Sequence, residues 1–289
     1  MALNNYKDIT LTVDGRIGTI TLNRPKALNS FSPLMFKELV DALRFLEAHE
    51  ETVFTVITGE GRFFSAGVDV GGIANETALP KEGLELKMER IAGGSLTIEM
   101  MRLMIDHTKV LVIAYNGPAV GGGAAWFPAM ADIVLVSDSC WLQIPFSALG
   151  LVPELGSVTF REHMGVRRTT EFLMFGRKLS AQELEGFGIA NQIFPTAGFH
   201  QRVNDYLKEQ LEVNDSKSMM ETKRLIVEPL RERRMLAVFR ASDALAEMFV
   251  EKRPAKRFAM KQAELEAKRK AKQAGASTTG ASLSAKSKL

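Results

Sequence analysis

The order of apolar and polar residues changes from a strand-like period to a helical period within the first fifty residues. Ile9–Val13 and Ile17–Leu22 lie on either side of an Asp-Gly dipeptide, which favours the tight turn of a β-hairpin. A Ser-Pro pair then precedes Leu34–His49, where apolar residues recur at helical spacing. This region predicts a strand pair followed by a helix.

Apolar runs and helical segments continue to alternate along the chain. The runs Val53–Thr58, Val110–Tyr115 and Asp132–Val136 predict buried strands, and a shorter run lies at Asn191–Phe194. The long segment Leu84–Ile105 has apolar positions suited to a helix with one buried face. Because this alternation places helices against a sheet, it favours an α/β architecture.

The composition is that of a globular protein. The chain has 289 residues, 46% hydrophobic and 25% charged, which suits one large domain or a domain with an extension. Its single cysteine, Cys140, excludes an intrachain disulfide and fits a reducing compartment. The N-terminus has no apolar signal core, and polar residues, proline and glycines interrupt the most apolar stretch, Val110–Val136. We therefore expect no membrane span.

Positive charge is concentrated at the C-terminal end. Residues 252–289 contain eleven Lys or Arg against two acids, whereas the remainder has a net charge of −6. Such a tail can indicate a nucleic-acid or membrane partner. It has no aromatic residue after Phe258 and suits a solvated helix that becomes a flexible tail from Ala271 onward, so we expect no nucleic-acid partner.

Two glycine-containing segments, each following an apolar strand, carry the candidate chemistry. They are Phe63–Asp69 (FFSAGVD) and Asn116–Gly123 (NGPAVGGG). Glycine permits positive φ and close backbone approach, and the start of a helix offers unpaired N–H groups to negative charge. Two such amides directed at one oxygen would form an oxyanion hole. Taken alone, however, glycines at such junctions are more often simple tight turns.

With further segments, the chain resembles the crotonase (enoyl-CoA hydratase/isomerase) superfamily over roughly residues 8–261. The similar segments are Asn23–Asn29 (NRPKALN), the two glycine-containing segments, Phe175–Ala181 (FGRKLSA), Gly186–Ala190 (GFGIA) and Phe249–Phe258. The resemblance implies an α/β fold: a spiral core of ββα units with the CoA-binding and catalytic site over residues 1–195, a helical C-terminal region over 196–265, and a flexible basic tail over 266–289. It also implies a homotrimer or hexamer.

The resemblance places the family's functional positions on this chain. The amides of Val68 and Gly122 would form the oxyanion hole for the thioester oxygen. The residues expected to contact the CoA moiety or the substrate are Lys26, Ala27, Leu28, Ala66, Gly67, Asp69, Gly121, Phe258 and Lys261. Because coenzyme A belongs to the acyl-CoA substrate, we expect no separate cofactor and no metal.

The candidate acid/base residue distinguishes between reactions of this family. Ala125 and Phe146 match the positions of the two hydratase glutamates, and neither can move a proton. Glu154 remains, in LGLVPELG, which is similar to the segment in Δ3,Δ2-enoyl-CoA isomerases where one glutamate shuttles the proton. Apolar neighbours are expected to raise the pKa of Glu154 and make it a better base near neutral pH. We therefore predict isomerisation of 3-enoyl-CoA to 2-enoyl-CoA in fatty acid oxidation.

Two alternative functions stay open. One is hydration or another crotonase-type reaction of secondary metabolism, and the other is a non-catalytic acyl-CoA-binding protein. Neighbouring features indicate little more chemistry: the four histidines lack metal-ligand spacing and suit surface or helix-capping positions. Met100, Met101 and Met104 suit core packing better than an acyl tunnel.

The final tripeptide offers a prediction about location. Ser287, Lys288 and Leu289 match the peroxisomal address that an import receptor reads. A peroxisomal location would fit the metabolism of fatty acyl-CoA, and it accounts for an exposed basic tail.

Overall fold

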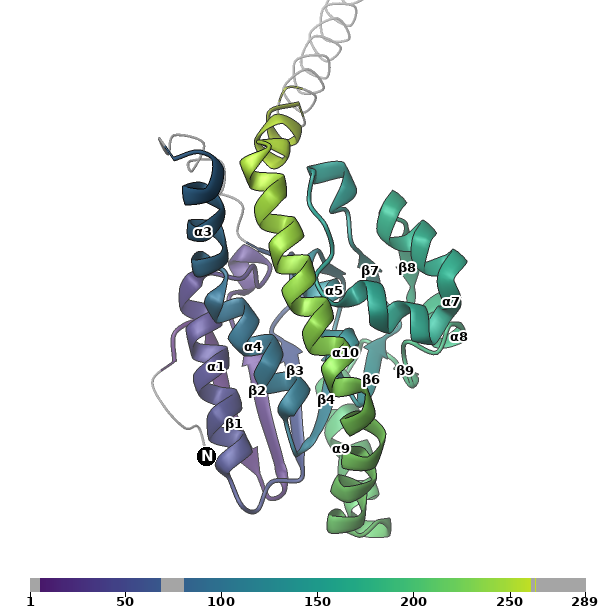
Figure 1. Ribbon diagram of the computed structural model, residues 1–289. Coiled ribbons are helices and arrows are strands. Elements are labelled where there is room, and N and C mark those ends of the chain that lie inside the picture. Colours follow the sequence, from purple (N-terminus) through teal and green to yellow (C-terminus); the bar gives the residue numbers. More distant parts are fainter. Residues whose placement is uncertain (1–5, 69–80, 261–262, 264–289) are drawn as a thin grey trace, which may run out of the picture.

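A six-stranded sheet forms the centre of the protein. The computed structural model describes residues 6–68, 81–260 and 263 (Figure 1). The strand order is β1-β2-β3-β4-β6-β9; β1 and β2 are antiparallel and every later pairing is parallel. The strands are β1 Ile9–Asp14, β2 Ile17–Leu22, β3 Phe54–Gly59, β4 Val110–Tyr115, β6 Ile133–Ser137 and β9 Gln192–Phe194. Five of these agree with the predicted strands to within one residue, and β9 lies inside the predicted run.

Helices cover both faces of this sheet. Strand β4 shows why: Leu111 and Ile113 belong to one apolar core, while Val110 and Val112 belong to another on the opposite face. A parallel strand buried on both faces reads as a continuous apolar run. The helices are α1 Pro33–Ala48, α3 Gly83–Gly93, α4 Ser95–Asp106, α5 Gly122–Ala125, α6 Phe127–Met130, α7 Gly156–Phe175, α8 Ala181–Gly186, α9 Phe199–Val213 and α10 Ser216–Val250. Helices α1 and α4 contribute to the first core, and α9 contributes to the second.

A second sheet contains three short strands. Its order is β5-β7-β8, from β5 Ala119–Val120, β7 Trp141–Gln143 and β8 Lys178–Ser180. Strand–strand–helix units therefore recur along the chain, as in β1-β2-α1 and β4-β5-α5. The predicted α/β fold class with a helical C-terminal region is confirmed. The sequence pattern did not predict the short strands of the second sheet.

One predicted helix is wrong as a single element. The segment Leu84–Ile105 forms two helices, α3 and α4, that meet at Gly94. Gly94 ends one helix and begins the next, with φ −79° and ψ −2°. Two consecutive glycines weaken the helix at this point, because glycine loses the most backbone entropy on helix formation. The apolar spacing continues across the break and conceals it.

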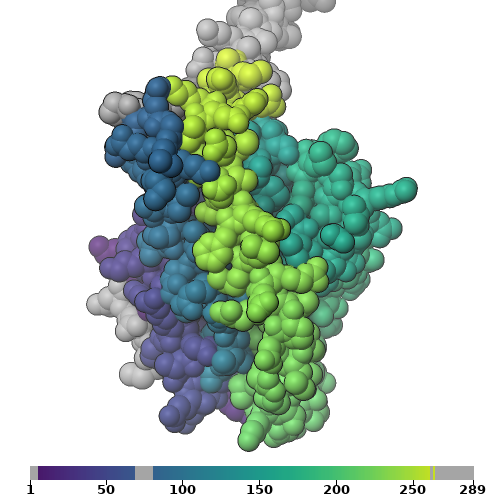
Figure 2. Space-filling model, viewed as in Figure 1, coloured from purple at the N-terminus to yellow at the C-terminus, as the bar shows by residue number. Residues whose placement is uncertain are grey.

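The long helix α10 crosses the front of the molecule and contacts the elements on both sides. It packs against α3 and α4 on one side and against α7 on the other, as Figure 1 and the space-filling view in Figure 2 show. Among the described residues, no helix is both long enough and apolar enough to cross a lipid bilayer.

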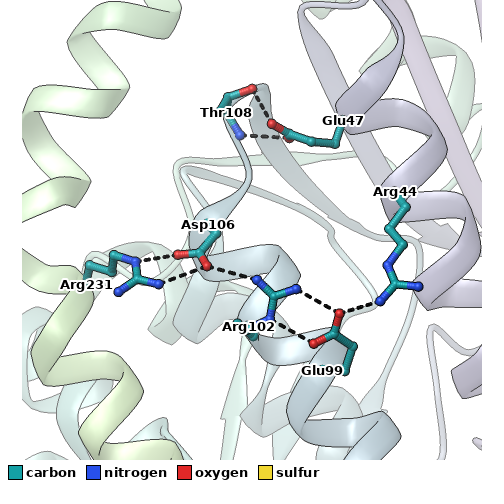
Figure 3. A network of polar contacts seen from close by, with 7 residues as sticks. All are labelled: Arg44, Glu47, Glu99, Arg102, Asp106, Thr108 and Arg231. Atoms are coloured by element: carbon teal, nitrogen blue, oxygen red, sulfur yellow. Dashed lines mark hydrogen bonds and ion pairs between the residues drawn. The ribbon is translucent and has the colours of Figure 1, made fainter.

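A chain of ion pairs ties α1, α4 and α10 together (Figure 3). Glu99 on α4 accepts hydrogen bonds from Arg44 on α1 (2.7 Å) and from Arg102 (2.8 Å). Asp106, at the end of α4, is bound by Arg102 at 3.3 Å and by Arg231 of α10 at 2.6 and 3.0 Å. Single exposed ion pairs contribute little, typically below about 1 kcal/mol. Linked in series, these five side chains fix the positions of three helices relative to one another.

Candidate active site

The two glycine-containing segments lie side by side. The Val120 amide donates to the Ser65 carbonyl oxygen at 2.9 Å, so the backbones pair just before the glycines. Gly67 has φ +91° and Gly121 has φ +57°, conformations that favour glycine. A methyl group added at Gly67 would lie 2.9 Å from the Val120 carbonyl oxygen and 3.6 Å from Gly121 Cα. Only glycine permits this approach, and it brings together the segments that present the predicted oxyanion amides.

The amide of Gly122 is available because of its place in a helix. Gly122 is the first residue of α5, so its N–H has no acceptor within that helix. The Trp126 indole covers the same residue: a methyl group on Gly122 would lie 2.4–2.7 Å from three atoms of its outer ring. Val68, the other predicted donor, follows Gly67 and is 37% exposed. Of the two predicted donors, Gly122 is therefore covered by the Trp126 ring, whereas Val68 is partly exposed to solvent.

A buried amide side chain holds the first glycine-containing segment in place. Asn29 is fully buried and donates to the carbonyl oxygens of Glu60 and Phe63 at 2.9 and 2.8 Å. Ser65 Oγ donates to the Asn29 carbonyl oxygen at 2.8 Å and accepts from the Gly67 amide at 3.1 Å. Sequence reasoning gave no role to Asn29 or Ser65. Their polar atoms fix the backbone that leads to Val68.

The predicted CoA-binding segment borders this loop. Lys26 and Ala27 lie in a 3-10 helix, Pro25–Ala27, and Leu28 follows in the left-handed region with φ +50°. The Leu28 carbonyl oxygen accepts from the Ala66 amide at 2.9 Å, which joins the two predicted binding segments. Lys26 is exposed.

Of the remaining predicted contacts, only Phe258 lies among the described residues. Phe258 is half-buried on a helical segment after α10, and no interaction joins it to Lys26, Ala27 or Leu28 among the described residues. Asp69 and Lys261 lie outside the described residues, as do Ser287, Lys288 and Leu289.

Glu154 lies on a constrained turn that begins α7. The next residue, Leu155, has φ +57° and ψ −42°, and the Gly156 amide donates to the Glu154 carbonyl oxygen at 2.5 Å. This is a γ-turn with positive φ, a rare and strained conformation for a residue with a side chain. Backbone strain of this kind concentrates at functional sites. The strained turn fixes the direction in which the Glu154 side chain leaves the backbone.

The Glu154 carboxylate is buried and has one side-chain partner. The residue is only 9% exposed, and Oε2 accepts a hydrogen bond from Trp126 Nε1–H at 3.1 Å. Burial raises the pKa of Glu154 above its ordinary value, while hydrogen bonds from its own amide and from Trp126 partly oppose the rise. A carboxylate with a raised pKa is a better base near neutral pH. Sequence reasoning missed Trp126, which is 28 residues away in the chain.

The two positions that correspond to hydratase glutamates are apolar and buried. Ala125 is fully buried in α5, and Phe146 is 8% exposed. The Phe146 ring lies 3.4 Å from the place that a methyl group on Gly121 would occupy, so it packs against the second glycine-containing segment. Glu154 is thus the carboxylate that the described structure places next to this segment, through Trp126.

The end of the chain's helical region supports the loop before Glu154. Arg257 Nε donates to the Ala148 carbonyl oxygen at 2.9 Å. Ala148 belongs to the 3-10 helix Ser147–Leu149, which precedes Gly150. Gly150 has φ +72°, and a methyl group there would lie 2.9 Å from the backbone of Arg253. The C-terminal helical segment therefore packs directly on the loop that leads to the candidate base.

The other candidate residues have structural surroundings. His107 is not a surface residue: it follows α4 as its C-terminal capping position, is buried, and contacts Glu47 (2.8 Å) and Thr55 (2.7 Å). Burial alone would raise the pKa of Glu47, but hydrogen bonds from His107 and Thr108 lower it to about 2. Met100, Met101 and Met104 lie in the apolar core. In the described part of the chain, no group of His, Cys, Asp or Glu is arranged to hold a metal ion.

Comparisons with known proteins identify the family of this chain. A family model described as enoyl-CoA hydratase/isomerase matches residues 12–272. Enoyl-CoA delta isomerase 2 of Homo sapiens is 34% identical over 204 residues, covering 70% of this chain and 50% of the relative. The peroxisomal enoyl-CoA delta isomerase 3 of Mus musculus is 34% identical over 203 residues, covering 70% and 62%. The chain thus spans about half to three fifths of the length of these two relatives.

A solved structure supports the fold over most of the chain. An enoyl-CoA hydratase/isomerase from Mycobacterium paratuberculosis is 30% identical, with a TM-score of 0.73. The superposition covers 88% of this chain and 98% of that one. The similarity therefore includes both the central sheet and much of the helical C-terminal region.

Proposed function

Because this chain belongs to the enoyl-CoA hydratase/isomerase family, we propose that it is a Δ3,Δ2-enoyl-CoA isomerase acting in fatty acid oxidation. The observation that carries the proposal is the buried carboxylate of Glu154, hydrogen-bonded to a tryptophan that packs on Gly122. The names of the human and mouse relatives support the same reaction.

In the proposed reaction, Glu154 both removes and returns one proton. Its carboxylate takes a proton from C2 of 3-enoyl-CoA, and the C2–H electron pair delocalises to give a dienolate. The amides of Val68 and Gly122 stabilise the thioester oxygen as negative charge develops there. The carboxylic acid of Glu154 then returns the proton to C4, which gives 2-enoyl-CoA with no other reactant. One oxyanion donor typically contributes about 2.7–4 kcal/mol to lowering the barrier.

The surroundings favour a single base over a pair of glutamates. Hydration would require a positioned water and a second proton-transfer group. Ala125 and Phe146 supply neither, and both are buried. Burial of Glu154 suits a proton that must stay on one group between removal and return, because little water reaches the carboxylate.

Glu154→Gln tests the proposal. The substitution keeps the shape of the side chain and removes its basicity, so we expect conversion of 3-enoyl-CoA to 2-enoyl-CoA to fall about 10²–10⁴-fold. Binding of a saturated acyl-CoA, measured by calorimetry, should persist because the amides remain. Glu162→Gln is the matched control, since Glu162 is an exposed residue of α7. Wild-type turnover by Glu154→Gln would refute the assignment of the base, and efficient production of 3-hydroxyacyl-CoA would favour hydration.

The substrate contacts, assembly and location belong to the same proposal. We infer that Lys26, Ala27, Leu28 and Ala66 contact the CoA moiety. The hydrogen bond from the Ala66 amide to the Leu28 carbonyl oxygen, which holds the two segments together, supports this. A homotrimer or hexamer is proposed from the family, and sedimentation analysis would test it. A peroxisomal location, read through Ser287–Leu289, is supported by the name of the mouse relative, a peroxisomal isomerase. Comparing fluorescent fusions with and without the tripeptide would test that location.

A further inference from the structure

We propose that Trp126 is a positioning residue for the acid/base step, which holds one oxygen of Glu154 and leaves the other to carry the proton. This inference rests on the proposed function, because it takes Glu154 as the base. Its basis is the hydrogen bond from Trp126 Nε1–H to Glu154 Oε2 together with the contact of the same indole with Gly122.

The indole connects the proposed base to a proposed oxyanion donor. Gly122 and Trp126 are four residues apart, so they lie on the same side of a helical turn, and the Trp126 amide donates to the Gly122 carbonyl oxygen at 2.9 Å. The outer ring of Trp126 packs on Gly122, and its N–H reaches Glu154. A single rigid side chain therefore sets the distance between the carboxylate and the backbone that receives the thioester oxygen.

Packing prevents the indole from turning away. Trp126 is 2% exposed, and its ring centroid lies 5.6 Å from that of Phe31 and 5.8 Å from that of Phe36. Both distances are in the range of favourable aromatic pairs. Because rotation of the ring would require these neighbours to move, the direction of the N–H bond is fixed before substrate binds.

Glu154 has no charged group that could take over this task among the described residues packed around it. Helices α5 (GGAA) and α6 (FPAM) contain no charged residue, and the first charged residue of α7 is Arg161. From the C-terminal segment, Arg253 and Arg257 contact Gly150 and Ala148 rather than Glu154. Burial raises the pKa of Glu154, and the hydrogen bonds from its own amide and from Trp126 lower it. The indole is thus the side chain that orients the carboxylate.

Holding one oxygen has a consequence for the path of the proton. Among the described side chains, the Trp126 indole N–H is the donor that reaches the carboxylate, at Oε2, and no side-chain donor reaches Oε1; the other donor to the carboxylate is the backbone amide of Glu154 itself. Oε1 is therefore the oxygen that takes the proton from C2, keeps it as an O–H, and returns it to C4. A carboxyl group free to rotate would present either oxygen and would lose the alignment that an efficient transfer needs.

The hydrogen bond can be observed apart from catalysis. The protein has two tryptophans, so its ¹H–¹⁵N spectrum contains two indole signals, and Trp141→Phe assigns them. Ionisation of Glu154 strengthens the hydrogen bond that the carboxylate accepts, so the Trp126 indole proton should move downfield as the pH rises. In Glu154→Gln this titration should be absent.

Trp126→Phe tests the effect on the reaction. Phenylalanine preserves an aromatic ring and deletes the N–H donor. Because the lost hydrogen bond favoured the carboxylate, the acidic limb of the kcat/KM profile should move to higher pH by about one pH unit. We expect kcat to fall at least about tenfold with KM within about twofold. Trp141→Phe is the matched control: it makes the same replacement at the other tryptophan of the protein, whose indole is not the one bonded to Glu154, and should leave the acidic limb unmoved.

The outcomes separate the two proposals. A titrating indole signal with a displaced acidic limb in Trp126→Phe supports the positioning role. The positioning role is overturned if the chemical shift of the Trp126 indole proton does not change as Glu154 ionises. It is also overturned if the kcat/KM pH profile of Trp126→Phe is identical to that of wild type. Either result holds even if Glu154→Gln is inactive. If Glu154→Gln keeps wild-type activity while its indole titration disappears, the hydrogen bond exists but Glu154 is not the base. That result refutes the proposed function and, with it, the catalytic purpose assigned to Trp126.

Discussion

Gly122→Ala should damage the candidate site through one steric collision. The new methyl group would lie 2.4, 2.5 and 2.7 Å from three ring atoms of Trp126, about 1 Å closer than an ordinary contact of about 3.4–4 Å. The backbone at Gly122 is helical, so alanine is not otherwise strained there. Either the ring or the first turn of α5 must move, and such overpacking of a core costs about 1–3 kcal/mol.

The same displacement should appear in catalysis. An oxyanion donor acts at about 2.7–3.1 Å, so a shift of about 1 Å removes most of its benefit, and kcat for 3-enoyl-CoA should fall about 10²–10³-fold. Stability would be measured by urea unfolding and activity by formation of 2-enoyl-CoA. Gly93→Ala is the matched control, because a methyl group there meets nothing within 4 Å and should leave activity unchanged.

A double substitution isolates the cause. Trp126→Phe shortens the side chain and withdraws the outer ring atoms. Gly122→Ala should therefore destabilise the Trp126→Phe variant less than it destabilises wild type, by about 1 kcal/mol or more. If the losses in unfolding free energy of the two single variants simply add in the double variant, the collision with Trp126 is refuted. Retention of wild-type kcat by Gly122→Ala would refute the oxyanion role of this amide.

Two further substitutions test the buried polar groups. Glu154→Gln should be more stable than wild type near pH 8 and equal near pH 4, because burial raises the pKa of Glu154 and wild-type stability falls as pH rises from the unfolded value of 4.5 through the folded pKa. Urea unfolding at both pH values measures this, and a wild type that is more stable near pH 8 would contradict it. Asn29→Ala should cost about 1–3 kcal/mol, since it removes the fully buried amide that donates to the Glu60 and Phe63 carbonyl oxygens. Asn214→Ala, which removes an exposed amide, should cost less than about 1 kcal/mol, and equal losses in the two variants would show that burial of Asn29 is unimportant.

Local sequence patterns predicted the main elements, and the family resemblance predicted that the two glycine-containing segments act together. Strands such as Val110–Tyr115 are visible because burial on both faces demands a continuous apolar run. The meeting of Gly67 and Gly121 was predictable from the family resemblance, since positive φ and close backbone approach restrict both positions to glycine. Elements and backbone positions with a strict local requirement were thus the predictable part.

The features that the sequence did not reveal depend on distant contacts. No role could be assigned to Trp126 from the sequence, because nothing in its neighbours shows that its N–H points to Glu154. The γ-turn at Leu155 is also hidden, because leucine carries no preference for positive φ and surrounding contacts must impose it. The break at Gly94 was missed for the opposite reason: the apolar period continues through it.

The contact of the C-terminal helical segment with the loop before Glu154 sets an order of events during synthesis. Arg257 and Ala148, which it joins, are 109 residues apart. A nascent chain therefore exposes Glu154 and its turn well before the residues that pack on them have left the ribosome. Contacts of such large sequence separation form late, after the loop-closure entropy has been overcome. The loop before Glu154 therefore acquires its final packing only after the C-terminal helical segment has been synthesised, even though the central sheet can begin to assemble earlier.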